Sequence, residues 1–258
     1  MELDYKKEVS GYGRKDGITV LCVWLGYTIL STVFASVRSM LSLSWISSGI
    51  VNIIFCILMA AGVFIILHLN KNSIMSIGLH KMKLGQTIRL GLLVSLIPII
   101  IFIIIAGIIN GFNEVDAIGL LFVLITTFCF AAHEDIIFVG FIQTRLYGFF
   151  KTQKVAILVS ALLFAFMHVP LWIITGRFDF SQPMLIIQSF SAWLILHVIM
   201  VAIFKRHFSI IPVFIFHTLW NFSFTFAQPG TIEFSWIGLA LAALTACILL
   251  WRSYKNEE

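Results

Sequence analysis

The chain has 258 residues, of which 60% are hydrophobic and only 11% are charged, and its formal net charge is +5. A soluble globular domain is about one quarter charged, so this composition excludes an ordinary soluble protein. The stretches between the apolar segments are too short for a second domain. The sequence therefore predicts one polytopic membrane protein.

Eight apolar stretches are long enough to cross about 30 Å of hydrocarbon. In chain order they occupy residues 17–37, 46–69, 88–110, 117–142, 155–175, 183–204, 208–227 and 232–251. The first lacks a small-residue cleavage pattern, so we interpret it as a retained span and not as a signal peptide. The predicted fold is an all-α membrane bundle of about eight transmembrane helices. Its single embedded domain spans 17–252, between a cytoplasmic N-terminal segment, 1–16, and a cytoplasmic tail, 253–258.

The basic residues indicate the orientation of these spans, because Lys and Arg favour the cytoplasmic side of short loops. With both termini in the cytoplasm, only Arg38 and Arg177 of the 17 Lys and Arg residues lie on the outer side. This asymmetry supports the span count and the topology together. Topology and anionic lipid headgroups explain the positive charge, so we expect the lipid bilayer as a partner and no nucleic acid.

Several polar residues lie inside the predicted spans, where an ionisable side chain is costly and often marks chemistry or transport. Glu134 and Asp135 lie in AAHEDIIFVGFIQTRL, His168 in FAFMHVP, and His217 with Asn221 in HTLWN. At about 1.5 Å of helical rise per residue, Glu134 and both histidines lie about 16 to 21 Å from a basic residue at the cytoplasmic end. We therefore expect the three spans to bring these side chains to one level of the membrane.

These residue types form a set suited to hydrolysis. A carboxylate and an imidazole that share one water can remove its proton, which makes the water a nucleophile against a peptide carbonyl. A second imidazole and a carboxamide can stabilise the resulting oxyanion. We predict that Glu134 and His168 activate water, while His217 and Asn221, four residues apart on one helix face, stabilise charge. Phe164, one turn before His168, is expected to limit how that imidazole turns.

The segments EDIIFVGFIQTRLYG, FAFMH and HTLWN resemble, in this order, the EExxxR, FxxxH and HxxxN motifs of the CPBP intramembrane proteases. This family is also called the CAAX protease and bacteriocin-processing or Abi family, and the resemblance covers about residues 70–227. It implies a membrane endopeptidase with a glutamate-dependent mechanism, in which Glu134 is the general base and His168 its partner. By the same resemblance, His217 and Asn221 form the oxyanion side.

The resemblance also bears on the substrate. Eukaryotic relatives cut the last three residues from prenylated CAAX proteins, whereas bacterial relatives are linked to bacteriocin maturation and self-immunity. Nothing in this sequence suggests a prenylated substrate, so we expect a membrane-associated peptide or protein substrate. For the same reason we expect a multi-pass protein of a bacterial cell membrane.

The first motif departs from the family pattern at two positions. Asp135 stands where the second Glu is expected, and Val139 stands where the Arg is expected. We hypothesise that Asp135 is either neutral or paired across helices, with His133, Gln143 and the facing histidines as candidate partners. The alternative function is a catalytically weak or inactive immunity or scaffold protein of the same fold. A polar network that only holds the bundle together, or a small-solute or proton transporter, are further alternatives.

Other residues of similar chemistry are expected to lie outside this site. Two His and one Glu are the ligands of many zinc hydrolases, but the HExxH spacing on one helix is missing. Ligands from three helices can still bind zinc, so the sequence does not exclude it. Because Asn221 beside His217 suits an oxyanion better than a cation, we predict no metal and no other cofactor. His133 points away from Glu134, and His197 is expected to be a packed or helix-bonding histidine.

Overall fold

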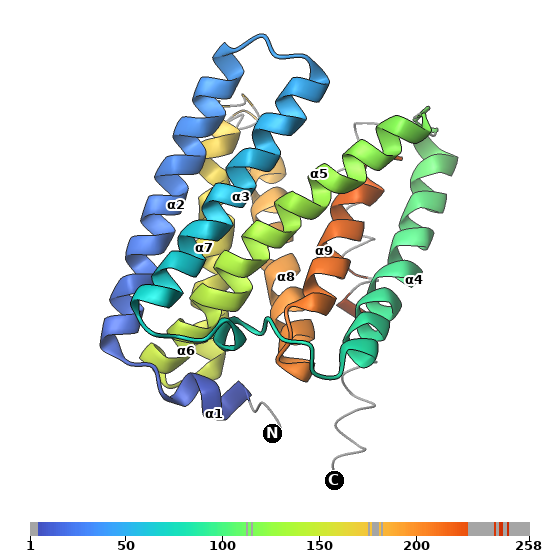
Figure 1. The fold of residues 1–258 in the computed structure, drawn as a ribbon. Coiled ribbons are helices and arrows are strands. Elements are labelled where there is room, and N and C mark those ends of the chain that lie inside the picture. The colour runs from blue at the N-terminus through green and yellow to red at the C-terminus, as the bar shows by residue number, and fades with distance from the viewer. Residues whose placement is uncertain are drawn as a thin grey trace.

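The computed structural model describes residues 5–111, 113–114, 116–174, 176, 181, 183–226, 240, 243–244 and 247, and within these ranges it is helical with no strand. Figure 1 shows the helices gathered into one bundle. In chain order the elements are α1 (Tyr5–Ser10), α2 (Arg14–Met40), α3 (Trp45–Leu69), the 3₁₀ helix η1 (Ile74–Ile77), α4 (Leu84–Asn110), α5 (Ala117–Asp135), the π-helix η2 (Ile136–Ile142), α6 (Gln143–Phe150), α7 (Gln153–Ile174), α8 (Pro183–His207) and α9 (Ile211–Ser223).

The apolar helices confirm an all-α, multi-pass membrane protein. Within the described residues, six stretches are long and apolar enough to cross a membrane: Arg14–Met40, Trp45–Leu69, Leu84–Ile105, Ala117–Phe150, Gln153–Ile174 and Ile186–His207. The expected span 208–227 corresponds to α9, which has only 13 residues. The expected span 232–251 lies almost entirely outside the described residues. The count of eight and the side on which the termini lie therefore stay predictions.

The packing of the helices brings distant parts of the chain to the C-terminal end of α5. Helix α5 runs obliquely across the bundle, and α9 lies between α4 and α5 (Figure 1). Helix α9 packs against α4, α5 and α8, while α8 also packs against α7. The polar residues that the sequence distributes over three apolar segments consequently lie on neighbouring helices.

The predicted span 117–142 is part of a longer helical run with an irregular middle. Helix α5, the π-helix η2 and α6 follow one another without a break, and every residue of η2 is buried. A π-helix is rare, and its i→i+5 bonding shifts which residues share a face relative to an α-helix. Gly140 within η2 allows close approach of η1, because a Cβ there would lie 3.0 Å from the carbonyl oxygen of Ile77.

Arg145 in α6 is a buried cation, with only 1% of its surface exposed. Its guanidinium lies 4.5 Å from the ring centroid of Tyr12 and 4.4 Å from that of Phe141. It donates hydrogen bonds to Oγ of Ser76, at 2.9 Å, and to Oγ1 of Thr144, at 2.7 Å. The chain before α2 and the loop containing η1 cover this side chain by folding against α6.

The N-terminal segment packs against the bundle through two tyrosines. The ring of Tyr5 lies 5.6 to 6.1 Å from the rings of Tyr147, Phe204 and Phe208. Burial raises the pKa of Tyr5 to about 12, so its hydroxyl stays neutral at ordinary pH. The backbone carbonyl of Tyr12 accepts a hydrogen bond from Nζ of Lys151. Residues 5–12 are thus attached to α6 and α8 at one end of the bundle.

Substitution of Gly148 by Ala tests this attachment. A Cβ at Gly148 would overlap Cβ of Tyr12 and lie 2.8 Å from its carbonyl oxygen, both of which belong to the segment before α2. We expect Gly148→Ala to destabilise the protein by about 1–3 kcal/mol, as overpacking commonly does. Thermal unfolding in detergent measures this loss.

The matched control is Gly85→Ala in α4, where a Cβ would meet nothing within 4 Å. An alanine there should raise stability slightly, because glycine lowers helix stability by about 0.5–1 kcal/mol relative to alanine. Equal unfolding temperatures for the two variants would show that Tyr12 does not pack on α6 as described.

Candidate active site

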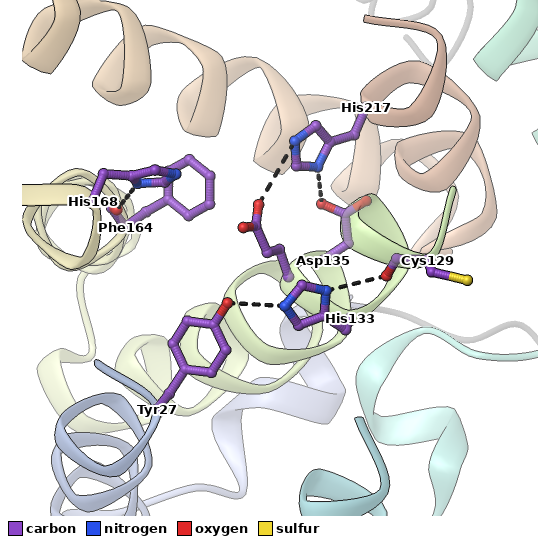
Figure 2. Close-up of polar contacts among 8 residues, drawn as sticks. Tyr27, Cys129, His133, Asp135, Phe164, His168 and His217 are labelled. Carbon is purple, nitrogen blue, oxygen red and sulfur yellow. Dashed lines mark hydrogen bonds and ion pairs between the residues drawn. The ribbon is translucent and has the colours of Figure 1, made fainter. Parts of the chain in front are cut away.

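A buried carboxylate and a buried imidazole connect α5 to α9. Nδ1 of His217 lies 2.9 Å from Oδ1 of Asp135, and both side chains are fully buried. An ionised carboxylate can only accept, so Nδ1 of His217 donates this hydrogen bond (Figure 2). This contact confirms that Asp135 is paired across helices with a facing histidine. In the described part of the chain His133 and Gln143, the other candidates, make no hydrogen bond to Asp135.

The other ring nitrogen of His217 faces Glu134. Nε2 of His217 lies 3.9 Å from Oε2 of Glu134, and the Glu134 side chain keeps 14% of its surface exposed. This separation suits an ion pair but is too long for a hydrogen bond. Among the described residues, Nε2 of His217 has no hydrogen-bond partner. The imidazole thus lies between two carboxylates, and of the two only Glu134 keeps part of its side chain exposed.

His168 on α7 is held by its own helix and by α8. Its Nδ1 donates to the carbonyl oxygen of Phe164 at 2.8 Å, and the Phe164 ring meets it edge-on at 4.9 Å. The ring of Trp193 stacks on the imidazole at 3.9 Å with an interplanar angle of 12°. Figure 2 shows the bond to Phe164. These contacts fix the imidazole plane and leave Nε2 for another partner.

The structure does not join every predicted site residue by a contact. Glu134, Asp135 and His217 form one connected group, whereas in the described residues no hydrogen bond or ion pair links His168 to Glu134 or His217. Asn221 lies one turn after His217 on α9 and is partly buried. It makes no hydrogen bond within the part of the chain that is described. The roles of His168 and Asn221 therefore stay predictions.

Sequence analysis missed Trp193, which stacks on His168. A tryptophan near the end of a span is usually an interfacial anchor. Trp193 lies ten residues after Pro183, the first residue of α8, and so falls within the helix. Its position inside the helix is the sequence feature that distinguishes Trp193 from an interfacial anchor. Its indole ring supplies the flat apolar surface that a positioned imidazole needs.

Two further buried histidines lie outside this group, as predicted. Nε2 of His197 lies 2.6 Å from Oγ of Ser160, which joins α8 to α7. His133 bonds to the hydroxyl of Tyr27 on α2 and to its own helix. Figure 2 shows that these His133 bonds are separate from the His217 contacts. Both histidines make interhelical bonds, although His133 directly precedes Glu134.

No group of three or more His, Cys, Asp or Glu side chains within the described residues is arranged to hold a metal ion. Glu134, Asp135 and His217 instead place one imidazole between two carboxylic acids. Such a set can accept, hold and return a proton.

Residues 116–223 match the family model described as Rce1-like, type II CAAX prenyl endopeptidase Rce1-like. This match confirms the family recognised from the three motifs. The Rce1-like segment runs from the N-cap of α5 to the end of α9 and contains all six predicted site residues. It covers less than half of the chain. No curated protein and no solved structure matched the chain.

A double-mutant cycle on Asp135 and His217 tests the central contact of the Rce1-like segment. Removing either partner leaves a buried polar group unpaired, which costs about 3–5 kcal/mol for a buried charged pair. We expect Asp135→Ala and His217→Ala each to lower the free energy of unfolding by such an amount. The double variant should lose about 1–3 kcal/mol less than the two single losses combined.

The free energy of unfolding in mixed micelles measures this coupling. The matched control is the hydrogen bond from Nη1 of Arg38 to Oδ1 of Asn52, 2.7 Å long and only partly buried. Its coupling should be smaller because water screens an accessible charge. Additive effects at Asp135 and His217 would contradict the contact.

Proposed function

We propose that the protein is an intramembrane endopeptidase that hydrolyses peptide bonds of membrane-associated proteins or peptides. The coarse class, a CAAX-type membrane protease, follows from the Rce1-like family match. The observation that carries the finer proposal is the position of Glu134. Its partly exposed carboxylate faces Nε2 of His217, while buried Asp135 holds the opposite edge of the same ring.

In the proposed reaction, Glu134 accepts a proton from a water molecule, with His168 as the second group that orients this water. The water oxygen attacks the peptide carbonyl carbon, and the carbonyl electron pair moves onto its oxygen. When the carbon–nitrogen bond breaks, Glu134 returns the proton to the leaving nitrogen. A general base that becomes a general acid in this way needs one carboxylate within reach of both water and substrate.

We assign His217 and Asn221 to the oxyanion. A proton on Nε2 of His217 points toward Glu134 and the space beside it, because Nδ1 is bound to Asp135. Asp135 balances the charge of a protonated ring and prevents the ring from turning, as acids beside catalytic histidines do. Asn221 lies one turn further along the same helix face, so its amide can donate to the same oxygen. Donors fixed before the reaction stabilise developing charge most effectively.

The Asp135 contact also bears on the missing family arginine. With Val139 at that position, Asp135 has no cation one turn away on its own helix. The bond from His217 gives this carboxylate a partner from α9 instead. This replacement favours a catalytically active site over an inactive one.

We further propose that the protein lies in a bacterial cell membrane, has eight spans with both termini in the cytoplasm, and acts in bacteriocin processing or self-immunity.

A catalytically weak or inactive immunity or scaffold protein is the second candidate. One observation favours it: both the Nδ1 atom and the ring face of His168 are engaged by Phe164 and Trp193, and its remaining nitrogen makes no bond to Glu134 in the described residues. In such a protein the polar group would hold α5 to α9, and protection would come from binding.

Glu134→Gln separates these two candidates. The amide keeps the shape of the side chain but cannot accept the water proton, so cleavage should fall by about 10²- to 10⁴-fold. His168→Ala should lower it as well. The assay incubates purified protein with a panel of membrane-associated peptides, with and without chelator, and reads products by mass spectrometry.

Glu114→Gln is the matched control, because Glu114 is exposed and lies in the chain before α5. It should cleave like the wild type. Size-exclusion profiles must show that every variant inserts and folds. If Glu134→Gln and His168→Ala both keep full cleavage, the enzymatic proposal is wrong, and cleavage lost on chelation would contradict the metal-free mechanism.

A further inference from the structure

Tyr27 on α2 reaches across the bundle to the residue that precedes Glu134. Its hydroxyl lies 2.9 Å from Nε2 of His133, and both side chains are almost completely buried, at 4% and 1% exposure. Nδ1 of His133 lies 3.1 Å from the carbonyl oxygen of Cys129. A carbonyl only accepts, so Nδ1 carries the proton of the neutral ring and the Tyr27 hydroxyl donates to Nε2.

These two bonds hold His133 on both edges of its ring. One bond ties it to the preceding turn of α5, and the other ties it to α2 (Figure 2). Glu134 is the next residue, so it shares a peptide bond with His133. A displacement of the His133 backbone therefore displaces Glu134, whose distance to His217 is already at the limit of an ion pair.

Tyr27 is also the first ring of an aromatic series that ends at His168. The Tyr27 ring meets Phe138 edge-on at 5.5 Å, and Phe138 meets Phe164 at 5.2 Å with an interplanar angle of 78°. Phe164 in turn contacts His168 through its ring and its carbonyl oxygen. Edge-to-face aromatic pairs have preferred geometries. Tyr27 thus contacts, directly at His133 and through the Phe138 ring at Phe164, the supports of both groups proposed to activate water.

A groove of about 390 Å³ runs between α2 and α3, and Tyr27 and Ile137 form part of its lining. Along α2 it extends from Thr19 to Leu30, roughly 16 Å at the usual helical rise. Tyr27 itself is only 4% exposed, so its hydroxyl bond to His133 is a buried contact between α2 and α5.

We propose that Tyr27 is a positioning residue of the active site, acting through its hydrogen bond to His133 and its ring contact with Phe138. The bond holds the turn of α5 that carries Glu134 at the correct distance from His217. The expected effect on kcat rests on the proposed function, whereas the expected effect of the Tyr27 bond on His133 and His217 does not. The two effects are tested separately.

The structural test compares histidine ¹⁵N resonances in nanodiscs for the wild type, Tyr27→Phe and Arg38→Met. Tyr27→Phe removes only the hydroxyl. Arg38→Met is the matched control, since Arg38 is on the same helix and donates one hydrogen bond to another helix away from the site, from Nη1 to Oδ1 of Asn52 at 2.7 Å. Variants His133→Gln and His217→Gln assign the signals.

The proposal predicts that Tyr27→Phe shifts the Nε2 resonance of His133 and also the ring resonances of His217, whereas Arg38→Met shifts neither. A change at His133 alone would overturn it, because Tyr27 would then be a local structural contact without influence on the site. No change at either histidine would overturn the hydrogen bond itself. Each of these outcomes is independent of whether the protein cleaves peptides.

The kinetic test uses the peptides cleaved by the wild type. Tyr27→Phe should lower kcat by about tenfold with little change in KM, because a displaced Glu134 affects the transition state more than substrate binding. It should also alter the pH profile of kcat, while Arg38→Met should change only thermal stability. Unchanged kcat in Tyr27→Phe would overturn the positioning role. If the wild type cleaves no peptide, the proposed function is overturned instead. The ¹⁵N comparison then decides whether Tyr27 positions the site.

Discussion

The buried bond between Asp135 and His217 is the interaction on which the rest of the site depends. A carboxylate inside a hydrophobic bundle is costly unless another group pairs with it, and the imidazole of His217 supplies that partner. The bond attaches the last residue of α5 to the middle of α9. It also fixes which nitrogen of His217 faces Glu134, so one contact serves both the packing of two helices and the geometry of the candidate active site.

A π-helix begins directly after Asp135, so regular α-helical spacing does not predict which side chains share a face in this region. All of η2 is buried, and its wider turns change which side chains share a face. Beyond it, Arg145 is a buried cation between the rings of Tyr12 and Phe141. Irregular helical turns often occur at functional sites, and this one separates the carboxylates of α5 from the packed end of the bundle.

Aromatic side chains surround the polar group and determine how its imidazoles are oriented. Trp193 and Phe164 fix His168, while Tyr27 and the turn of α5 fix His133. Rings of this size have few rotamers and large contact areas, so they hold polar groups in place at little entropic cost. The Rce1-like match gives the chemical class. The aromatic contacts hold His168 and His133, while the bond from His217 gives Asp135 a partner in the absence of the family arginine.

The sequence by itself determined the membrane fold class and the segments that carry the polar residues, because hydropathy and helical spacing are local properties. Its three motifs pointed to the family that the Rce1-like match supports. It also named a facing histidine among the partners of Asp135. The tertiary structure decided which histidine that is, and it decided the contacts of Tyr27 and Trp193, the burial of Arg145 and the short length of α9. The first of these contacts joins residues 82 positions apart, and the bond of Tyr27 to His133 joins residues 106 apart. Periodicity does not encode such pairings, since they arise only when helices pack and buried polar groups find partners.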